Sequence, residues 1–237
     1  MESKQPSPDP RLISYLTLRK TIGWLGILLP AAMILGNAVF GHCYTIQSSV
    51  SHYYYTLTGN LLTGILCAVA LFLIAYKGYN RLDQRASALA GCLALLIAFF
   101  PTDLQTMAAP GTDRPACVIF TLPDHVLRNA VHYAGAGGFF LTLAYISWFL
   151  FTKGEDNPTE EKLLRNRVYR TCSLVIVTAV LLIGLYGIFG ETGDAISRLK
   201  PVFFLEWAAL LAFGIAWLVK GELVLKDKHA KTVDRLR

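Results

Sequence analysis

Six long stretches of apolar residues, separated by shorter polar segments, dominate the sequence. They fall at about residues 21–40, 57–76, 86–101, 129–151, 171–190 and 201–219. Since roughly 20 apolar residues in a helix cross the hydrocarbon core of a bilayer, the pattern predicts six transmembrane helices. The third stretch is the weakest, because Arg85 and Asp103 bracket a short apolar run. We therefore expect an all-α, polytopic membrane bundle that forms a single integral membrane domain over residues 1–237.

The composition agrees with a membrane protein. Apolar residues make up 54% of the chain and charged residues only 16%, with a mean hydropathy of +0.46, whereas soluble proteins carry about 25% charged residues. The missing charges are expected where the surface faces lipid. Five cysteines and 12% aromatic residues do not fit disordered, collagen-like or disulfide-scaffold proteins.

The formal charge of +6 is distributed unevenly along the chain. Most of the 22 Lys and Arg residues lie before the first apolar stretch, in the second and fourth connecting segments and in the C-terminal tail; the others are Arg114, Arg128, Arg198 and Lys200. Because short loops rich in Lys and Arg stay cytoplasmic, both termini are predicted to be cytoplasmic and loops 41–56, 102–128 and 191–200 extracytoplasmic. We expect the cell (inner) membrane as the location, membrane lipid as a partner and no nucleic acid.

Two stretches carry small residues at helical spacing. Ala86, Ala90, Ala94 and Ala98 recur along the third, and Ala130, Ala134 and Gly138 along the fourth. Small residues let helix backbones approach in lipid, so these two helices are predicted to pack against each other or each against another neighbour. Pro30 is expected to kink the first helix.

Polar residues near the predicted spans concentrate toward the extracytoplasmic boundary. The run Thr121-Leu122-Pro123-Asp124 is typical of a helix start with Thr121 as N-cap. That start would place His125, Arg128 or Asn129, and His132 on one face. Glu206 is the only acidic residue inside a predicted span, which makes it a candidate functional group. The alternative is that Glu206 pairs with Arg128, Lys200 or His132 only to hold helices together.

These residues predict one polar site on the extracytoplasmic side that binds or processes a lipid or another small amphiphile. The expected ligand-binding residues are Ser49, Ser51, His52, Tyr54, Asp103, His132 and Glu206, and the candidate catalytic residues are Ser51, His52, Asp103 and His132. No cofactor is required by this reading, and the sequence leaves open whether the protein is an enzyme and whether it forms a homo-oligomer.

Three alternatives follow from the same residues. Zinc held by His52, Asp103 and His132 would make a membrane lipid hydrolase, although His125 and His132 are not spaced as a helical zinc pair. Titration of Glu206 and His132 would suit a proton-coupled transporter. A purely structural or partner-binding membrane protein needs no chemistry at all.

Cysteine positions add one expectation about the loops. Cys43 and Cys117 both fall in predicted extracytoplasmic loops, where an oxidising compartment permits disulfides. A Cys43–Cys117 bond would tie the first such loop to the second, although the sequence alone does not decide whether it forms.

The motifs at the predicted outer boundary resemble those of a known family. Ser49, Ser51 and Tyr53 form Ser-x-Ser-x-Tyr, Pro101 and Asp103 belong to Phe-Pro-x-Asp, and His132 opens the fourth stretch. Together they resemble a bacterial six-span membrane family of unknown function that is distantly similar to the FRAG/DRAM/Sfk proteins. The resemblance implies a six-helix bundle with a polar outer site and supplies no reaction.

A second resemblance is to membrane hydrolases of the alkaline ceramidase and adiponectin-receptor type. Ser48 and His52 match their Ser-x3-His element, and Asp103 matches their aspartate. The sequence departs from that pattern because it contains no His-x3-His pair and six apolar stretches instead of seven. This resemblance is the one that implies zinc.

Overall fold

The computed structural model describes residues 10–78, 80–104, 117–154, 159–189 and 195–225, and these residues form helices and loops without any strand. The elements are α1 (Pro10–Gly41), a 3-10 helix η1 (Ser51–Tyr55), α2 (Gly59–Ala75), α3 (Arg81–Phe99), α4 (Val126–Tyr145), a π-helical turn η3 (Ile146–Leu150) that continues α4, α5 (Glu160–Phe189), α6 (Ala195–Arg198) and α7 (Pro201–Lys220). The prediction of an all-α fold is confirmed for the described residues.

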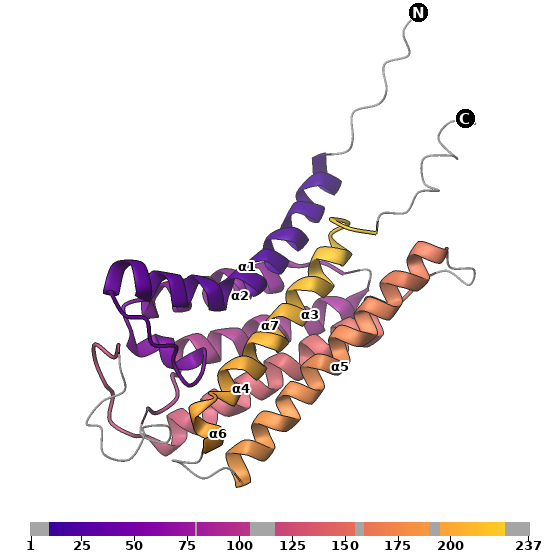
Figure 1. Cartoon of the computed structure of the whole chain (residues 1–237). Coiled ribbons are helices and arrows are strands. Elements are labelled where there is room, and N and C mark those ends of the chain that lie inside the picture. The colour runs from indigo at the N-terminus through magenta and orange to yellow at the C-terminus, as the bar shows by residue number, and fades with distance from the viewer. Residues whose placement is uncertain (1–9, 79, 105–116, 155–158, 190–194, 226–237) are drawn as a thin grey trace, which may run out of the picture.

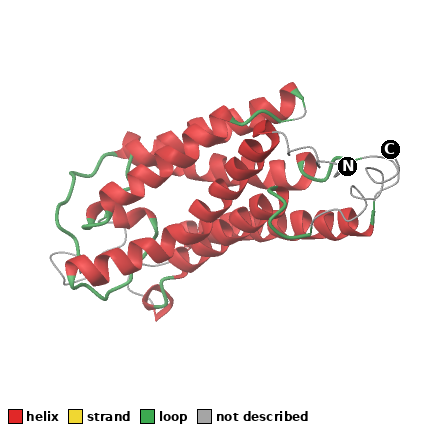
Figure 2. Ribbon diagram, turned by 90° about the horizontal axis from the view of Figure 1, so that it is seen from above, coloured by secondary structure: helices red, strands yellow, loops and turns green. Residues whose placement is uncertain are grey.

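The long helices pack in a closed ring. Going round it, α1 contacts α2, followed by α3, α4, α5 and α7, and α7 returns to α1. The start of α1 and the end of α7 lie at the same end of the bundle (Figure 1), where the Arg19 guanidinium donates a hydrogen bond to the Lys220 carbonyl over 3.1 Å. Figure 2 shows the same bundle from above, with only helices and loops.

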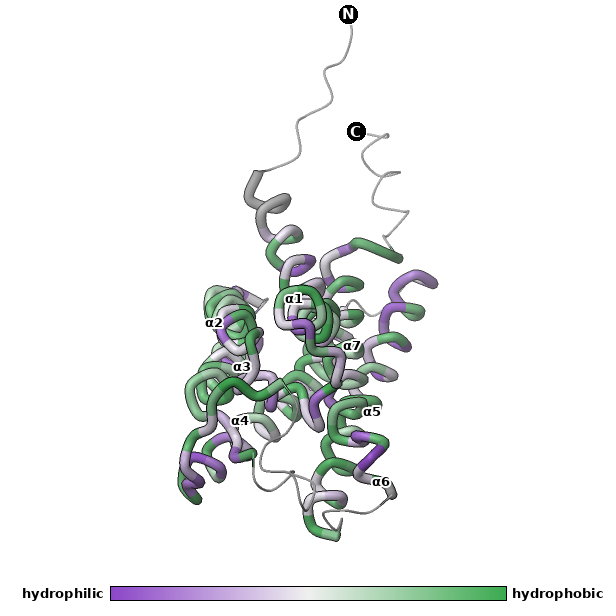
Figure 3. The backbone as a smooth tube through the Cα atoms, turned by 60° about the vertical axis from the view of Figure 1, so that its left-hand side comes forward, coloured by the Kyte–Doolittle hydropathy of each residue, from purple (hydrophilic) through white to green (hydrophobic). Residues whose placement is uncertain are grey.

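Five of the described helices are long and apolar enough to cross a membrane. They are Tyr15–Gly41, Arg81–Phe99, Val126–Leu150, Glu160–Phe189 and Pro201–Lys220. The apolar helix α2 has 17 residues, which reach about 25 Å. Apolar segments run along the length of the bundle in Figure 3, and large apolar side chains such as Leu181 and Ile188 are exposed on α5. A sixth span, at α2, stays a prediction.

The helix ends differ from the predicted spans in two places. α1 begins at Pro10 and α5 at Glu160, ten or more residues before the predicted starts at 21 and 171. Hydropathy identifies only the apolar part of a helix. The helix itself extends beyond that part as long as its backbone hydrogen bonds continue. Basic residues at the start of α5, such as Arg165 and Arg170, are good helix formers.

The predicted small residues are buried on α3 but only partly so on α4, where Ala130 and Ala134 are exposed. Ala86, Ala90, Ala94 and Ala98 are all buried, and α3 contacts both α2 and α4. On α4, a Cβ added to Gly135 would approach Leu96 to 3.2 Å, and one added to Gly138 would approach Leu93 to 3.3 Å. These two helices therefore pack closely, as predicted, but the predicted stripe on α4 is wrong at Ala130 and Ala134, because Gly135 and Gly138 make the contact.

A second close crossing, between α1 and α7, was not predicted. A Cβ added to Gly23 would lie 2.8 Å from the Gly214 carbonyl oxygen, and one added to Gly214 would lie 2.5 Å from the Gly23 carbonyl oxygen. The two backbones therefore meet where neither residue has a side chain. Pro30 lies farther along α1, and α1 is bent part-way along its length (Figure 1), as expected when proline removes a backbone donor.

Replacing Gly214 by alanine is expected to destabilise the protein, because its methyl group has no room against the Gly23 backbone. The loss should be about 1–3 kcal/mol, or roughly 3–10 °C in the melting temperature of the detergent-solubilised protein. Gly184→Ala on α5 is the matched control, since nothing lies within 4 Å of its added Cβ. Equal melting temperatures for the two variants would contradict the close crossing.

Candidate functional site

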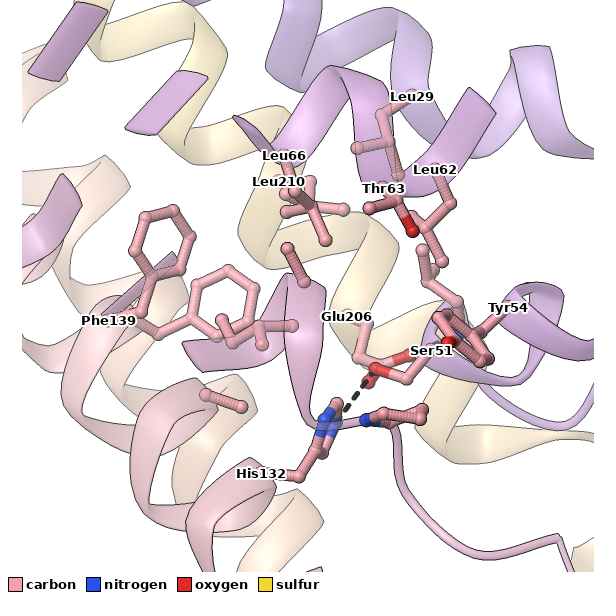
Figure 4. A pocket seen from close by; sticks show the side chains of 16 residues that line it. Leu29, Ser51, Tyr54, Leu62, Thr63, Leu66, His132, Phe139, Glu206 and Leu210 are labelled. Atoms are coloured by element: carbon pink, nitrogen blue, oxygen red, sulfur yellow. Dashed lines mark hydrogen bonds between the residues drawn. The ribbon is translucent and has the colours of Figure 1, made fainter. Parts of the chain in front are cut away.

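A pocket lies inside the ring of helices, toward the end that carries η1 (Figure 4). Its cavity volume is about 50 Å³ for the centre of a water molecule, and its empty space comes to about 590 Å³ when the open solvent at its mouth is counted. Most of its lining is apolar and comes from α1, α2, the end of α3, α4 and α7: Leu29, Leu62, Leu66, Ile97, Ala98, Pro101, Ala136, Phe139, Phe140 and Leu210. Val50, Ser51, Tyr54, Thr63, His132 and Glu206 complete the lining. The pocket is thus an apolar chamber with polar groups gathered around η1.

Glu206 fastens the segment before η1 to α7. Its Oε2 accepts a hydrogen bond from the Val50 amide at 2.5 Å, and its Oε1 accepts one from the Ser49 hydroxyl at 3.2 Å. The Ser49 oxygen in turn accepts from the Ser51 amide at 3.0 Å. A carboxylate at membrane depth needs such donors, and here a folded loop supplies them.

The interpretation that Glu206 pairs with Arg128, Lys200 or His132 is wrong. Within the described parts of the chain, no ion pair reaches Glu206. Arg128 binds Asp103 instead, and the Lys200 amine donates to the Ile46 carbonyl. Glu206 does hold elements together, but through neutral donors on the loop.

His132 of α4 links η1 to the end of α3. Its Nδ1 lies 2.7 Å from the Phe100 carbonyl oxygen, and its Nε2 lies 3.1 Å from the Ser51 hydroxyl. A carbonyl oxygen only accepts hydrogen bonds, so Nδ1 must carry the proton. In the neutral ring Nε2 is then an acceptor, and the Ser51 hydroxyl donates to it (Figure 4).

Asp103 belongs to a neighbouring polar cluster that is not part of the pocket lining. Its carboxylate forms an ion pair with Arg128 and accepts hydrogen bonds from the Asn129 amide at 2.9 Å and the His125 backbone at 3.2 Å. Arg128 also donates to the Pro101 carbonyl at 3.1 Å. This cluster joins the end of α3 to the start of α4 and so fixes His132 relative to Phe100.

The start of α4 differs from the prediction. The helix begins at Val126, with His125 rather than Thr121 as the N-cap. The His125 side chain accepts a hydrogen bond from the Arg128 amide. Asp103 accepts a hydrogen bond from the His125 amide and forms an ion pair with Arg128, and these contacts fix the residue at which α4 begins. Pro123 precedes the helix, and its carbonyl oxygen accepts a hydrogen bond from the Arg128 guanidinium at 2.8 Å.

His52 is buried in η1 beneath the pocket lining, with 3% of its surface exposed. Burial and, to a smaller extent, the nearby His132 lower the pKa of His52 to about 4, although a hydrogen bond to the Asp103 backbone opposes the shift. His52 is therefore neutral near pH 7 and acts as a packed structural residue.

A covalent and aromatic layer covers this end of the bundle. Cys43 and Cys117 form a disulfide with a Cα–Cα distance of 5.8 Å, so the bond that the sequence left open is present. The Ile119 amide donates to the Tyr55 carbonyl at 2.9 Å, and Phe120 packs against the rings of Tyr54 and Tyr55. Residues 105–116 of the second loop lie outside the described residues.

The predicted site residues thus divide into two groups. Ser51, Tyr54, His132 and Glu206 line one pocket, with Ser49 bound to Glu206, whereas His52 and Asp103 lie beside it. No group of three or more His, Cys, Asp or Glu side chains suited to a metal ion occurs among the described residues. Sequence reasoning missed the Phe100 carbonyl and the apolar chamber, because both depend on how the helices meet.

No family model, curated protein or solved structure matches this chain. The family resemblances of the motifs therefore stay expectations, and the function has to be argued from the pocket and its contacts.

The buried, neutral state of His52 should make folding depend on pH. An unfolded histidine titrates near 6.5, so as the pH falls the unfolded chain binds a proton that folded His52 accepts only near pH 4. Stability should therefore be lost as the pH falls from about 6.5 to 4, by about 3 kcal/mol. Melting temperatures between pH 7.5 and 4.5 measure this loss.

His52→Gln should show a smaller pH dependence than the wild type. The matched control is His42→Gln, because His42 lies exposed in the same loop. A His52→Gln variant with the full wild-type slope would contradict the assignment.

Proposed function

We propose that this chain is an integral protein of the cell (inner) membrane that binds a lipid or another small amphiphile in the pocket between its helices. The observation that carries the proposal is the division of the pocket into apolar walls and a polar group at η1. An amphiphile needs both parts, since its tail gains about 25 cal/mol per Å² of apolar surface buried and its head requires hydrogen-bond partners.

The polar part offers both donors and acceptors to a head group. Tyr54 and Thr63 carry hydroxyls, and Ser51, His132 and Glu206 have hydrogen-bonding atoms that line the same chamber. The apolar part extends from there past Leu62, Leu66 and Leu210 toward the middle of the bundle (Figure 4). A ligand would lie with its head at η1 and its tail along α2 and α7.

The proposed arrangement in the membrane has six spans, with α2 as the sixth, and both termini cytoplasmic. Two observations support it. The described ends of α1 and α7 lie together at the end of the bundle that carries Arg19 and Lys220, as expected of a cytoplasmic, positively charged face. The Cys43–Cys117 disulfide lies at the opposite end, which suits an oxidising compartment.

Fusions at the C-terminus test this orientation. Green fluorescent protein attached there should fluoresce in intact cells, and alkaline phosphatase attached at the same position should be inactive, because it folds only where disulfides form. Active phosphatase with dark fluorescent protein would reverse the orientation.

Filling the pocket should weaken the binding of its ligand. Ala136 lines the chamber from α4, so Ala136→Phe is expected to weaken the binding of a fluorescent fatty-acid analogue to purified protein by at least about tenfold, since the new ring takes the place of the ligand's tail. Ala134→Phe is the matched control, because Ala134 is exposed on the same helix. Unchanged affinity in Ala136→Phe, or no binding by the wild type, would refute the proposed function.

A further inference from the structure

The contacts of Ser51 and His132 match those of an activated nucleophile. A serine attacks carbonyl carbon efficiently only when an adjacent base accepts its proton and a third group holds that base in the correct tautomer. Ser51 donates to His132 Nε2 over 3.1 Å, and the Phe100 carbonyl accepts the His132 Nδ1 proton over 2.7 Å. The base is therefore aligned with Nε2 toward the serine hydroxyl.

We propose that Ser51 and His132 form a catalytic dyad that cleaves a carboxylic ester of the amphiphile held in the pocket. This inference rests on the proposed function, because the apolar chamber must hold the acyl chain. Both side chains line that chamber, so the ester of a bound amphiphile reaches the serine oxygen.

The reaction proceeds in two balanced steps with water as the second reactant. In the first, Ser51 Oγ bonds to the ester carbonyl carbon as its proton passes to His132 Nε2. The bond from that carbon to the alkoxy oxygen then breaks, and the leaving oxygen takes the proton from Nε2, which leaves an acyl-serine and an alcohol. In the second, water gives a proton to Nε2 as its oxygen bonds to the acyl carbon. The bond from that carbon to Ser51 Oγ then breaks, Oγ takes the proton from Nε2, and the carboxylic acid departs.

The negative charge that develops on the carbonyl oxygen needs a donor nearby. The Tyr54 side chain lines the same pocket next to Ser51 (Figure 4). It packs on Tyr55 and Phe120 through its ring, and its hydroxyl makes no hydrogen bond to another described residue. Tyr54 is therefore the group assigned to bind that oxygen.

Glu206 acts on this dyad as a positioning residue. Glu206 makes no hydrogen bond to the Ser51 hydroxyl. It accepts hydrogen bonds from Ser49 and Val50, and Ser49 accepts one from the Ser51 amide. Glu206 thus sets the backbone from which the Ser51 side chain projects. The Asp103–Arg128 pair does the same for the Phe100 and His132 side of the dyad.

An alkyl fluorophosphonate, which phosphorylates activated serines, tests the dyad on the purified full-length protein. Peptide mass spectrometry of the labelled wild type is expected to find the adduct on Ser51. Ser51→Ala should lose the adduct, and His132→Gln should slow labelling by at least about 100-fold, because the general base is gone. Ser48→Ala is the matched control and should label at the wild-type rate, since Ser48 does not line the pocket.

The wild-type adduct decides the question even where a variant fails to fold. An unlabelled wild type, an adduct on another residue only, or wild-type labelling rates in His132→Gln would each overturn the dyad. The fatty-acid analogue is titrated into the same wild-type preparation. Binding without labelling leaves the proposed function standing and removes only the esterase, whereas absence of binding removes the proposed function itself.

Discussion

The site depends on the requirement that a carboxylate among apolar helices find hydrogen-bond donors within the protein. Glu206 meets it by taking the Ser49 hydroxyl and the Val50 amide, which forces a loop without Lys or Arg to fold inward against α7. The Phe203 amide reaches the Ser48 carbonyl at 3.1 Å and adds to the same attachment. Once this loop is held, η1 starts at Ser51, and its side chains face the helices instead of solvent. The cost of desolvating one acidic residue thus determines where the polar end of the pocket lies.

Small residues determine where α1 and α7 lie in contact and where a pocket forms between the helices. α1 and α7 touch backbone to backbone at Gly23 and Gly214, and the pocket begins beyond that contact, at Leu29 and Leu210. The bend of α1 past this crossing (Figure 1) lets the helices diverge toward η1. A side chain at either glycine would force the two helix backbones apart at this crossing.

The sequence predicted the helices better than the way they meet. Apolar stretches are local signals, so the helices could be predicted, whereas the sequence placed Cys43 and Cys117 in two predicted outer loops without deciding whether they pair. The Gly23–Gly214 crossing was not, because its partners are far apart in sequence and neither glycine stands in an obvious stripe. Within the site, Ser51, His132 and Glu206 were recognisable as costly polar groups near one boundary. The role of the Phe100 carbonyl could not be predicted, since every residue has a backbone carbonyl. His52 and Asp103 were predicted as site residues because of their side-chain types, but their partners hold them beside the pocket.

The disulfide closes a covalent ring over a sequence separation of 74 residues, and η1, α2 and α3 all belong to that ring. Closing a loop of this length removes disorder from the unfolded chain worth about 4 kcal/mol. A force pulling on either end of the protein can therefore strip away α1 or α4 to α7, but it cannot straighten the chain between Cys43 and Cys117. The segment that carries Ser51 would therefore unfold last and remain a closed loop. Any machinery that unfolds this protein for degradation must either reduce the disulfide or translocate two segments of the chain side by side.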